Sequence, residues 1–381
     1  MPHIKVEPFN KDILSSNSDG FIEHIATLGS NSMILVNYDG IRLFLDIINK
    51  KSEYLVKPNK ITKISDSSII KDILNKFAKE FNLKVTHSNT NVKPYKPKVA
   101  HWAQKGIEDF YNFSSEYSKV KVEVGFGSAR HLLYRAKEEP DTLFIGIEIH
   151  TPSISQLLKQ INLQGIKNIL VLNYDARLLL EMLPSNILDT IYVHFPVPWD
   201  KKPHRRVISE FFLRESLRTL KKGAYLELRT DSENYYSYAL EVFSSTKVAS
   251  FSVKKNIDIE VISKYEERWR RMNKNIYTLV VDALEESKEK TLDIDFTFSS
   301  VDNSVDLPKE SLVKDDFFVH FGKRYEMDRG FVVECSFGSF NIPEKKIIAV
   351  VDGKCSYLPS NPVKSLVNLK AHNLIKEVLN G

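Results

Sequence analysis

Between about residues 120 and 283, short apolar runs alternate with helical segments, and this alternation constrains the fold more than any other feature. Strands that are apolar almost throughout are typically buried on both faces, and strand–helix alternation is typical of a parallel sheet. We therefore predict an α/β domain with a doubly wound, mostly parallel sheet. The predicted strands are Val120–Gly125, Leu143–Ile149, Asn168–Tyr174, Thr190–Phe195, Ala224–Thr230, Ala249–Lys254 and Tyr277–Asp282. The predicted helices are Ala129–Lys137, Pro152–Gln164, Ala176–Leu183, Val207–Leu220 and Tyr235–Ser244.

The flanking regions have different patterns, so we expect four segments along the chain. Residues 1–87 contain the apolar runs Met33–Tyr38 and Ile41–Ile48 and a helical pattern near Ser68–Phe81, which indicates a small α+β domain. Residues 88–99 hold two prolines and no apolar periodicity, as in a linker. After the α/β domain at 100–285, residues 286–381 are rich in strand patterns and end in a predicted helix. We predict a separate β-rich domain of unknown role there.

Composition excludes several classes of protein. Two cysteines, Cys335 and Cys355, cannot form a disulfide framework or a Cys-rich zinc site, and the histidines lack metal-ligand spacing. No apolar run approaches the roughly 18 residues of a membrane span, and the N-terminus lacks an apolar export signal. We therefore expect a cytoplasmic protein without a membrane or metal partner. The net charge is +5, and residues 197–222 alone carry eight Lys/Arg against three Asp/Glu, which indicates a local basic patch.

The segment EVGFGSAR, which ends the first predicted strand and opens a helix, is the strongest indication of a ligand. Gly125 and Gly127 would let the backbone approach a ligand closely. Three acids, Glu123, Glu148 and Asp175, come at the ends of three successive strands, where open α/β sheets bind ligands. S-adenosylmethionine (SAM) offers matching donors. We assign Glu123 to its methionine end, Glu148 to the ribose and Asp175 to the adenine side.

A nicotinamide dinucleotide is the rival ligand, since its fingerprint also uses Gly-X-Gly and a ribose-binding acid. Here the third glycine is missing, because Ser128, Ala129 and Arg130 follow Gly127. An acid before the first glycine also has no evident partner on an anionic pyrophosphate. The sequence therefore favours SAM.

The fourth predicted strand leads into HFPVPWDKKPHRR, which combines an aromatic residue with a basic run. Trp199 offers a flat face for stacking on a base. Lys201, Lys202, Arg205 and Arg206 follow and are suited to phosphate contacts. A basic run alone is usually a solvated loop, but this one lies at the ligand end of a strand, which indicates nucleic-acid binding.

Two further segments lie near this predicted edge. Asp231 follows the fifth strand in LRTDSENYY, and its alternative interpretation is the N-cap of the next helix, with Thr230 and Ser232 as competing caps. SKYEERWRRMNK (Ser263–Lys274) carries five Lys/Arg, two Glu and a tryptophan. It is a second substrate edge or a charged surface helix, and the sequence favours neither.

Taken in order, EVGFG, GIEIH, NYDA, FPVPW with its KKPHRR tail, RTDSENY and SKYEERW resemble the bacterial tRNA (guanine-N7)-methyltransferases. The resemblance implies a class I methyltransferase (Rossmann-like) fold with a seven-stranded sheet, and methylation of guanine 46 in the tRNA variable loop. It implies that Glu123, Glu148 and Asp175 contact SAM. It also implies that Lys201, Asp231 and the segment from Ser263 to Glu266 contact the guanine or its surroundings.

One departure from this family concerns the chemistry. The family usually reads FPDPW, and its Asp is commonly assigned a catalytic role, whereas this chain has Val197. Guanine N7 carries a free lone pair, so no proton must be removed before attack, and positioning with a nearby carboxylate can suffice. We predict Asp231 as that catalytic carboxylate.

Two other interpretations stay open: a SAM-dependent methyltransferase of another RNA or of a small molecule, or an RNA-binding protein of the same fold without catalysis, which Val197 favours. The resemblance does not cover residues 1–99 and 286–381. We expect these regions to extend the RNA footprint or to mediate assembly, and the sequence assigns no oligomeric state.

Overall fold

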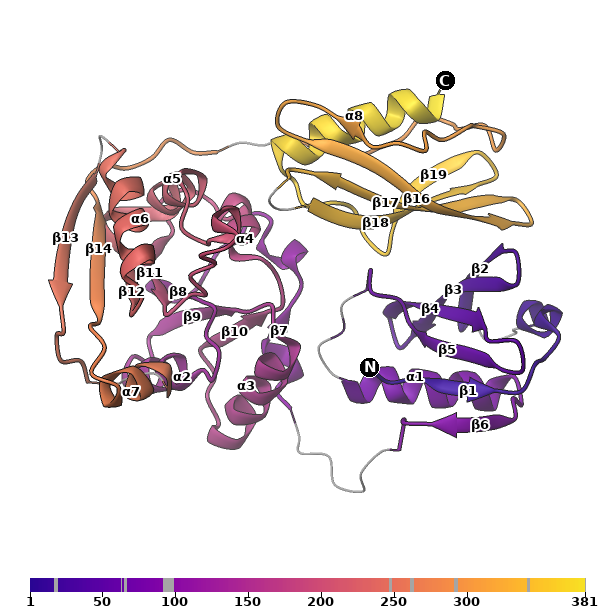
Figure 1. Ribbon diagram of the computed structural model, residues 1–381, viewed down its shortest axis with the longest axis horizontal. Coiled ribbons are helices and arrows are strands. Elements are labelled where there is room, and N and C mark those ends of the chain that lie inside the picture. Colours follow the sequence, from indigo (N-terminus) through magenta and orange to yellow (C-terminus); the bar gives the residue numbers. More distant parts are fainter. Residues whose placement is uncertain are drawn as a thin grey trace. The chain divides into compact units, whose positions relative to one another are not determined.

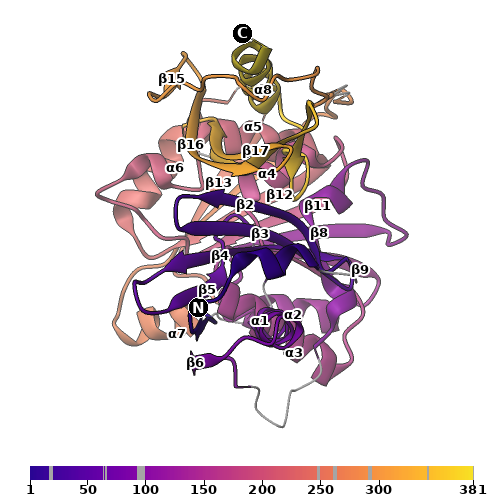
Figure 2. The ribbon, with the colours of Figure 1, turned by 90° about the vertical axis from the view of Figure 1, so that its right-hand side faces the viewer.

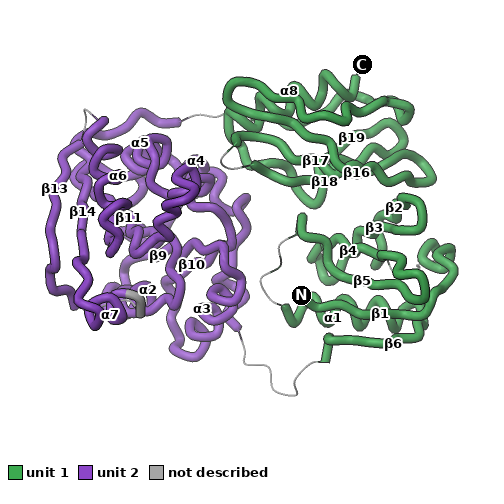
Figure 3. The backbone as a smooth tube through the Cα atoms, in the orientation of Figure 1, with its two compact units in different colours: residues 1–96, 293–381 green, residues 97–292 purple. Residues whose placement is uncertain are grey.

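The chain divides into two compact units that are not contiguous in sequence. The computed structural model describes residues 1–16, 20–62, 64, 67–91, 99–246, 249–260, 264–290, 294–340 and 343–380. Unit 1 combines residues 1–96 with 293–381, and unit 2 comprises residues 97–292 (Figure 3). Each unit is described by itself below.

Unit 2 is built on one sheet, which has eight strands among the described residues, in the order β13-β14-β12-β11-β8-β9-β10-β7 (Figure 1). Neighbours from β7 to β12 are parallel, and β14 runs antiparallel to both β12 and β13. The strands are β7 (Gln104–Lys105), β8 (Lys119–Val124), β9 (Thr142–Ile147), β10 (Ile169–Leu172), β11 (Leu188–His194), β12 (Leu220–Thr230), β13 (Ala249–Lys255) and β14 (Tyr277–Ala283).

The predicted mostly parallel α/β sheet is therefore present, but the predicted number of seven strands needs correction. The eighth strand, β7, has two residues and pairs with β10 at the sheet edge. A strand that short leaves no periodic pattern in the sequence, and only the neighbouring strand defines it.

Helices cover both faces of this sheet, with α2 and α3 on one face and α4, α5 and α6 on the other (Figure 1). Local signals set several of their ends. The side chains of Ser209 and Ser232 cap α5 and α6 by accepting backbone N–H groups, and Gly165 ends α3 in a left-handed conformation. The helices are α2 (Arg130–Glu138), α3 (Thr151–Gln164), α4 (Ala176–Met182), α5 (Glu210–Thr219), α6 (Glu233–Ser244) and α7 (Lys264–Arg271), with short 3₁₀ turns η2 (His101–Ala103), η3 (Ile107–Phe110) and η4 (Pro203–Arg205).

The half of the sheet formed by β8, β11 and β12 has one polar face, which the sequence analysis did not predict. The paired positions Glu123–Tyr192 and Tyr192–Glu227 bring these side chains to the same face. Every second residue in VKVEV, IYVH and YLELR is polar or aromatic, which is the pattern of a strand with one apolar face. β8 and β11 are largely buried, as predicted for strands covered on both faces, but one of those faces carries polar side chains.

Unit 1 is a large antiparallel sheet with one helix packed against each of its two halves. Its sheet order is β19-β18-β17-β16-β2-β3-β4-β5-β1-β6, with β15 paired to β16. Helix α8 packs on β16 and β17, and α1 packs on β5 (Figure 2). The elements are β1 (Ile4–Val6), η1 (Lys11–Ser16), β2 (Ile22–Leu28), β3 (Asn31–Tyr38), β4 (Ile41–Asn49), β5 (Tyr54–Pro58), α1 (Ser67–Glu80), β6 (Val85–Ser88), β15 (Leu312–Val313), β16 (Phe318–Met327), β17 (Gly330–Gly338), β18 (Pro343–Val351), β19 (Lys354–Leu358) and α8 (Leu366–Asn380).

The two ends of the chain meet inside unit 1, where the sequence analysis expected two separate domains. Glu326 of β16 pairs with Thr27 of β2, so one sheet runs through both segments. A shared apolar cluster supports this junction: Phe44 and Leu35 pack with Tyr325 and Val332. Burial of these side chains removes apolar area that either segment alone would expose to water. Among the described helices of the whole chain, none has the length and apolar character of a membrane span.

Candidate functional site

The glycine turn after β8 has the backbone geometry of a ligand cradle. Gly125 and Gly127 have φ angles of 69° and 50°, in the left-handed region that favours glycine. The Gly125 N–H donates to the carbonyl of Ile147 at 2.8 Å, which ties the turn to β9. A Cβ at Gly125 would meet no described atom within 4 Å, so space lies open beside the turn. The free N–H groups at the start of α2 follow directly.

Glu148 joins this turn from the end of β9. One of its carboxylate oxygens accepts the Gly127 N–H at 3.1 Å, and the other accepts the N–H groups of Ile149 and His150 at 2.8 and 3.0 Å. These bonds hold the carboxylate against the glycine turn. The structure thus brings together two of the predicted cofactor-binding elements.

Asp175 follows β10 and is the N-cap of α4. Its carboxylate accepts the Arg177 N–H at 2.9 Å and pairs with the Arg177 guanidinium at 2.8 Å. About a third of the side chain stays exposed (31%). Asp175 therefore caps α4 just beyond the end of β10, and part of its carboxylate remains accessible.

Glu123 lies behind the glycine turn, buried on the polar face. Its carboxylate bonds to His131 Nδ1 at 2.8 Å, and the residue is 4% exposed. The His131 ring packs against His194, with 4.6 Å between ring centroids. His194 in turn bonds Glu227 at 2.7 Å, and its burial lowers its pKa although Glu227 opposes the shift. Glu123 is therefore part of a buried His–Glu cluster.

The loop after β11 is conformationally strained at two aromatic residues. Phe195 and Trp199 have φ angles of 50° and 47°, which bulky residues rarely adopt. The Phe195 N–H donates to the Arg229 carbonyl at 2.7 Å, which anchors the loop on β12. Val197 is 60% exposed between them. Strain of this kind clusters at functional sites, which supports a role for this loop.

The basic run beyond this loop divides into exposed and buried residues. The Arg205 guanidinium lies 5.2 Å from the Trp199 ring centroid, and Lys201 and Arg205 are exposed. Arg206 differs, because it is 8% exposed. Its Nε donates to the Pro198 carbonyl at 2.8 Å, and its guanidinium lies 4.5 Å from the Tyr238 ring centroid. Arg206 therefore supports the loop from inside, in place of the expected phosphate contact.

Asp231 lies just beyond β12 and forms an ion pair with Lys274 at 2.8 Å. Ser232, not Asp231, caps α6, so the alternative interpretation of Asp231 as a cap is excluded. The Lys274 ammonium also lies 3.9 Å from the Trp269 ring centroid. Asp231 thus stands at the same edge of the sheet as Trp199, with a cation that neutralises it.

Glu266 is buried, contrary to the expectation that it contacts the substrate. It is 1% exposed and pairs with Arg229 at 2.7 Å and with Arg270 at 2.9 Å. These contacts attach α7 to β12. Ser263, the other end of the predicted substrate segment, lies outside the described residues.

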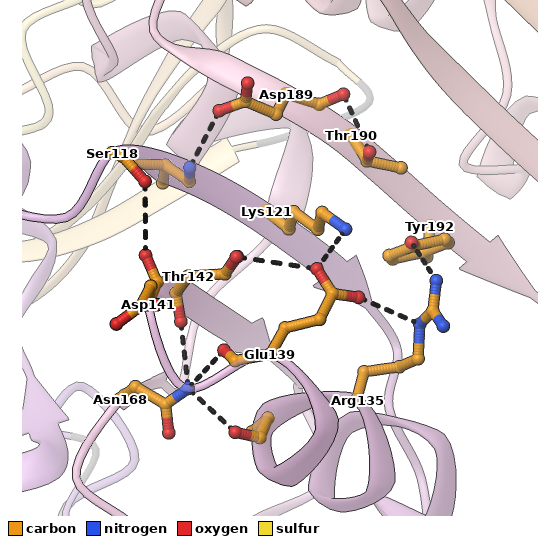
Figure 4. A network of polar contacts seen from close by, with 12 residues as sticks. Ser118, Lys121, Arg135, Glu139, Asp141, Thr142, Asn168, Asp189, Thr190 and Tyr192 are labelled. Atoms are coloured by element: carbon orange, nitrogen blue, oxygen red, sulfur yellow. Dashed lines mark hydrogen bonds and ion pairs between the residues drawn. The ribbon is translucent and has the colours of Figure 1, made fainter.

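A network of polar contacts around Glu139 holds α2 on the polar face. Glu139 contacts both Lys121 of β8 and Arg135 of α2, and Arg135 donates to the Tyr192 hydroxyl at 3.5 Å (Figure 4). The sequence analysis missed this face, although the alternation of polar residues in three strands was a visible signal.

Among the described residues, no cluster of three or more His, Cys, Asp or Glu is arranged to hold a metal ion.

Comparisons with known proteins agree with this arrangement. A family model described as "Putative methyltransferase" matches residues 117–279, which lie within unit 2. A tRNA (guanine-N(7)-)-methyltransferase of Wolinella succinogenes is 36% identical over the full length of both chains. Its counterpart in Helicobacter pylori is 36% identical over 92% of this chain and 88% of its own length.

A solved structure of an antibiotic-related methyltransferase aligns at 20% identity with a TM-score of 0.34, covering 44% of this chain and 89% of its own, which is too distant to add to the assignment. The identity and coverage of the Wolinella and Helicobacter proteins are sufficient to assign the family. The chain belongs to the tRNA (guanine-N(7)-)-methyltransferase family.

Proposed function

We propose that the protein transfers a methyl group from SAM to N7 of a guanine in tRNA, at position 46 of the variable loop. The observation that carries the proposal is the convergence of two sets of residues at one edge of the sheet. The glycine turn follows β8, and Glu148, which bonds to this turn, follows β9. The Trp199 loop follows β11, and Asp231 follows β12. Carboxyl ends of parallel strands share an edge, so cofactor and base would meet there. Methylation of tRNA implies a cytoplasmic protein.

The residues at the glycine turn fit SAM. The open space beside Gly125 allows a ligand to approach the backbone, and Glu148 presents a carboxylate suited to ribose hydroxyls. The exposed part of Asp175 is suited to the adenine amine. Glu123 uses one acceptor site on His131 and retains others for the methionine ammonium. When bound, SAM supplies a methyl group on a positively charged sulfonium.

The reaction places modest demands on the chain's own residues. Guanine N7 has a lone pair at neutral pH, so no general base is needed, and Val197 in the loop is compatible with catalysis. The chain must orient the base and stabilise the positive charge that develops on it, and electrostatic stabilisation is usually the largest catalytic contribution. Asp231 is the carboxylate we assign to that task. Lys274 neutralises it in the free protein, and an RNA phosphate would offer Lys274 another anion.

The exposed residues of the loop after β11 are suited to RNA. Trp199 can stack on a base, and its neighbours Lys201 and Arg205 can contact phosphates. Arg206 is excluded from this set because it is buried. The RNA contact we propose therefore includes fewer basic residues than the basic run in the sequence contains.

Incubation of the purified protein with an unmodified tRNA transcript and methyl-labelled SAM, followed by nucleoside analysis, tests the proposal. We expect labelled 7-methylguanosine that maps to the variable loop. Label at another nucleoside would contradict the assignment of N7. Binding of SAM and tRNA without methylation would support the second candidate, a non-catalytic RNA-binding protein, which the exposed Val197 favours.

A further inference from the structure

A polar pocket lies on the polar face of unit 2, beside the proposed reaction site. Its volume is about 320 Å³, within the range of about 300–1,000 Å³ typical of ligand pockets. It adjoins both halves of the site, because His131 belongs to the first turn of α2 and His194 directly precedes the Trp199 loop. Its wall includes His131, Tyr192, His194, Tyr225, Glu227 and Arg229.

Arg229 in this wall has hydrogen-bond donors that no described residue satisfies. The residue is 1% exposed, and its Nη2 donates to Glu266 at 2.7 Å. Its Nε and Nη1 are buried without a partner among the described residues. Buried polar groups in folded proteins nearly always have a partner, so these two donors call for an acceptor, which a ligand in the pocket can supply.

The charges around Arg229 select a neutral ligand. The carboxylates of Glu266 and Glu227 both act on Arg229, and Glu260 in the pocket wall pairs with Arg135, another wall residue, at 3.7 Å, so the cations here already have anionic partners. An additional anion would be repelled by these carboxylates. Glu227 gives one acceptor site to His194, and its other acceptor sites have no hydrogen-bond donor among the described residues. The pocket therefore offers donors and acceptors, between aromatic side chains, to a flat polar molecule such as a nucleobase.

We propose that this pocket receives the reacting guanine by its Watson–Crick edge, an inference that rests on the proposed function. Arg229 donates to O6, and Glu227 accepts from N1–H and the 2-amino group. N7 lies on the opposite side of the ring from N1 and the 2-amino group, so it stays available for methyl transfer. Adenine carries an amine where guanine has O6 and has no N1–H, so this pattern selects guanine.

The test compares tRNA transcripts that carry guanine or inosine at the target position, with the full-length protein and its Glu227→Gln variant. Inosine lacks only the 2-amino group. We expect wild-type kcat/KM to fall roughly 10-fold on inosine, and E227Q to lower kcat/KM on guanine by roughly 10- to 100-fold. The guanine preference of E227Q should shrink toward 1, because its side chain no longer accepts from that amine as a charged group. Glu138→Gln, on the exposed side of α2, is the matched control and should behave as wild type.

The proposal would be overturned if E227Q lowered kcat/KM equally on the guanine and inosine transcripts, or did not lower it at all. Absence of methylation by the wild type on guanine would instead refute the proposed function itself. SAM binding checks that each variant is folded.

If E227Q does not fold, Arg229→Lys decides the question, since it keeps a positive charge beside Glu266. We expect R229K to lower kcat/KM on guanine by roughly 10-fold. On 2-aminopurine, which lacks O6, R229K and wild type should have the same kcat/KM. An equal loss on both bases would overturn the assignment of Arg229.

Discussion

At the residue scale, the ion pair between Asp231 and Lys274 controls the charge at the proposed reaction site. The two side chains are 2.8 Å apart, and Lys274 is also held over the Trp269 ring. A methylated guanine carries a positive charge, so a carboxylate close to it stabilises the transition state more than the neutral base. Asp231 can do this only when Lys274 has another partner.

Substitution of Asp231 tests this role. Asp231→Ala should lower kcat by roughly 10²-fold, the usual loss for one electrostatic group at a reacting centre. SAM affinity should not change, because Asp231 lies beyond β12 and the glycine turn lies between β8 and α2. Initial rates with labelled SAM and tRNA give the first quantity, and titration calorimetry gives the second. A normal rate for D231A would remove Asp231 from the mechanism.

The neighbouring residues Arg205 and Arg206 should respond differently to the same substitution. Arg205→Ala should weaken tRNA binding and reduce the slope of log affinity against log salt by about 1, as for one lost phosphate contact. Arg206→Ala should leave that slope unchanged and lower the free energy of unfolding by about 1–3 kcal/mol, because it leaves the Pro198 carbonyl without its donor. Filter binding at several salt concentrations and thermal unfolding separate the two outcomes. Identical salt slopes for both variants would contradict the assignment of Arg205 to RNA binding and of Arg206 to the stability of the loop.

At the scale of elements, α7 depends on a buried ionic contact with β12. Glu266 lies between Arg229 and Arg270, and Glu266 and Arg229 are both 1% exposed. Removal of one member of a buried ion pair leaves the other charge without compensation, which is strongly destabilising. The contacts of Glu266 with Arg229 therefore hold α7 on the sheet, whereas the sequence indicated only a charged segment there.

The adjacent glutamates of α7 provide a matched test. Glu266→Gln should lower the free energy of unfolding by about 3–5 kcal/mol, or release α7 locally if the rest of unit 2 holds. Glu267→Gln should change it by less than about 1 kcal/mol, because Glu267 makes an exposed pair with Arg130 at 3.1 Å. Denaturant unfolding measures both. A stable E266Q protein that binds tRNA poorly would restore the original view of Glu266 as a substrate contact.

At the scale of the whole molecule, unit 2 contains every residue of the proposed site, and unit 1 has no assigned task. We propose that unit 1 extends the RNA footprint. A fragment of unit 2 must run at least to residue 290, because Ser185 and Asn186 bond the backbone at Lys288 and Ser287, and Lys290 pairs with Glu215.

The fragment 97–292 should bind SAM as the full chain does, since all its sheet pairings are internal. Its tRNA affinity should fall by roughly 10-fold or more through lost phosphate contacts. Calorimetry with SAM and filter binding with tRNA measure the two affinities. Equal tRNA affinity of fragment and full chain would show that unit 1 is not part of the RNA footprint.

The sequence by itself determined what depends on neighbouring residues. Strand and helix positions in unit 2, the glycine turn, the serine cap of α6 and the aromatic–basic loop all follow from local periodicity and backbone preference. The family resemblance rested on these same local segments, which is why the family was predicted correctly.

Only the tertiary structure decided which side chains are buried and which distant segments meet. Nothing near Thr27 in the sequence indicates that it pairs with Glu326. In the sequence, Arg206 and Glu266 resemble exposed charges. In the structure, Arg206 packs against Tyr238, and Glu266 pairs with Arg229. Contacts of this kind gain their energy from burial and desolvation between remote segments, so no local pattern records them.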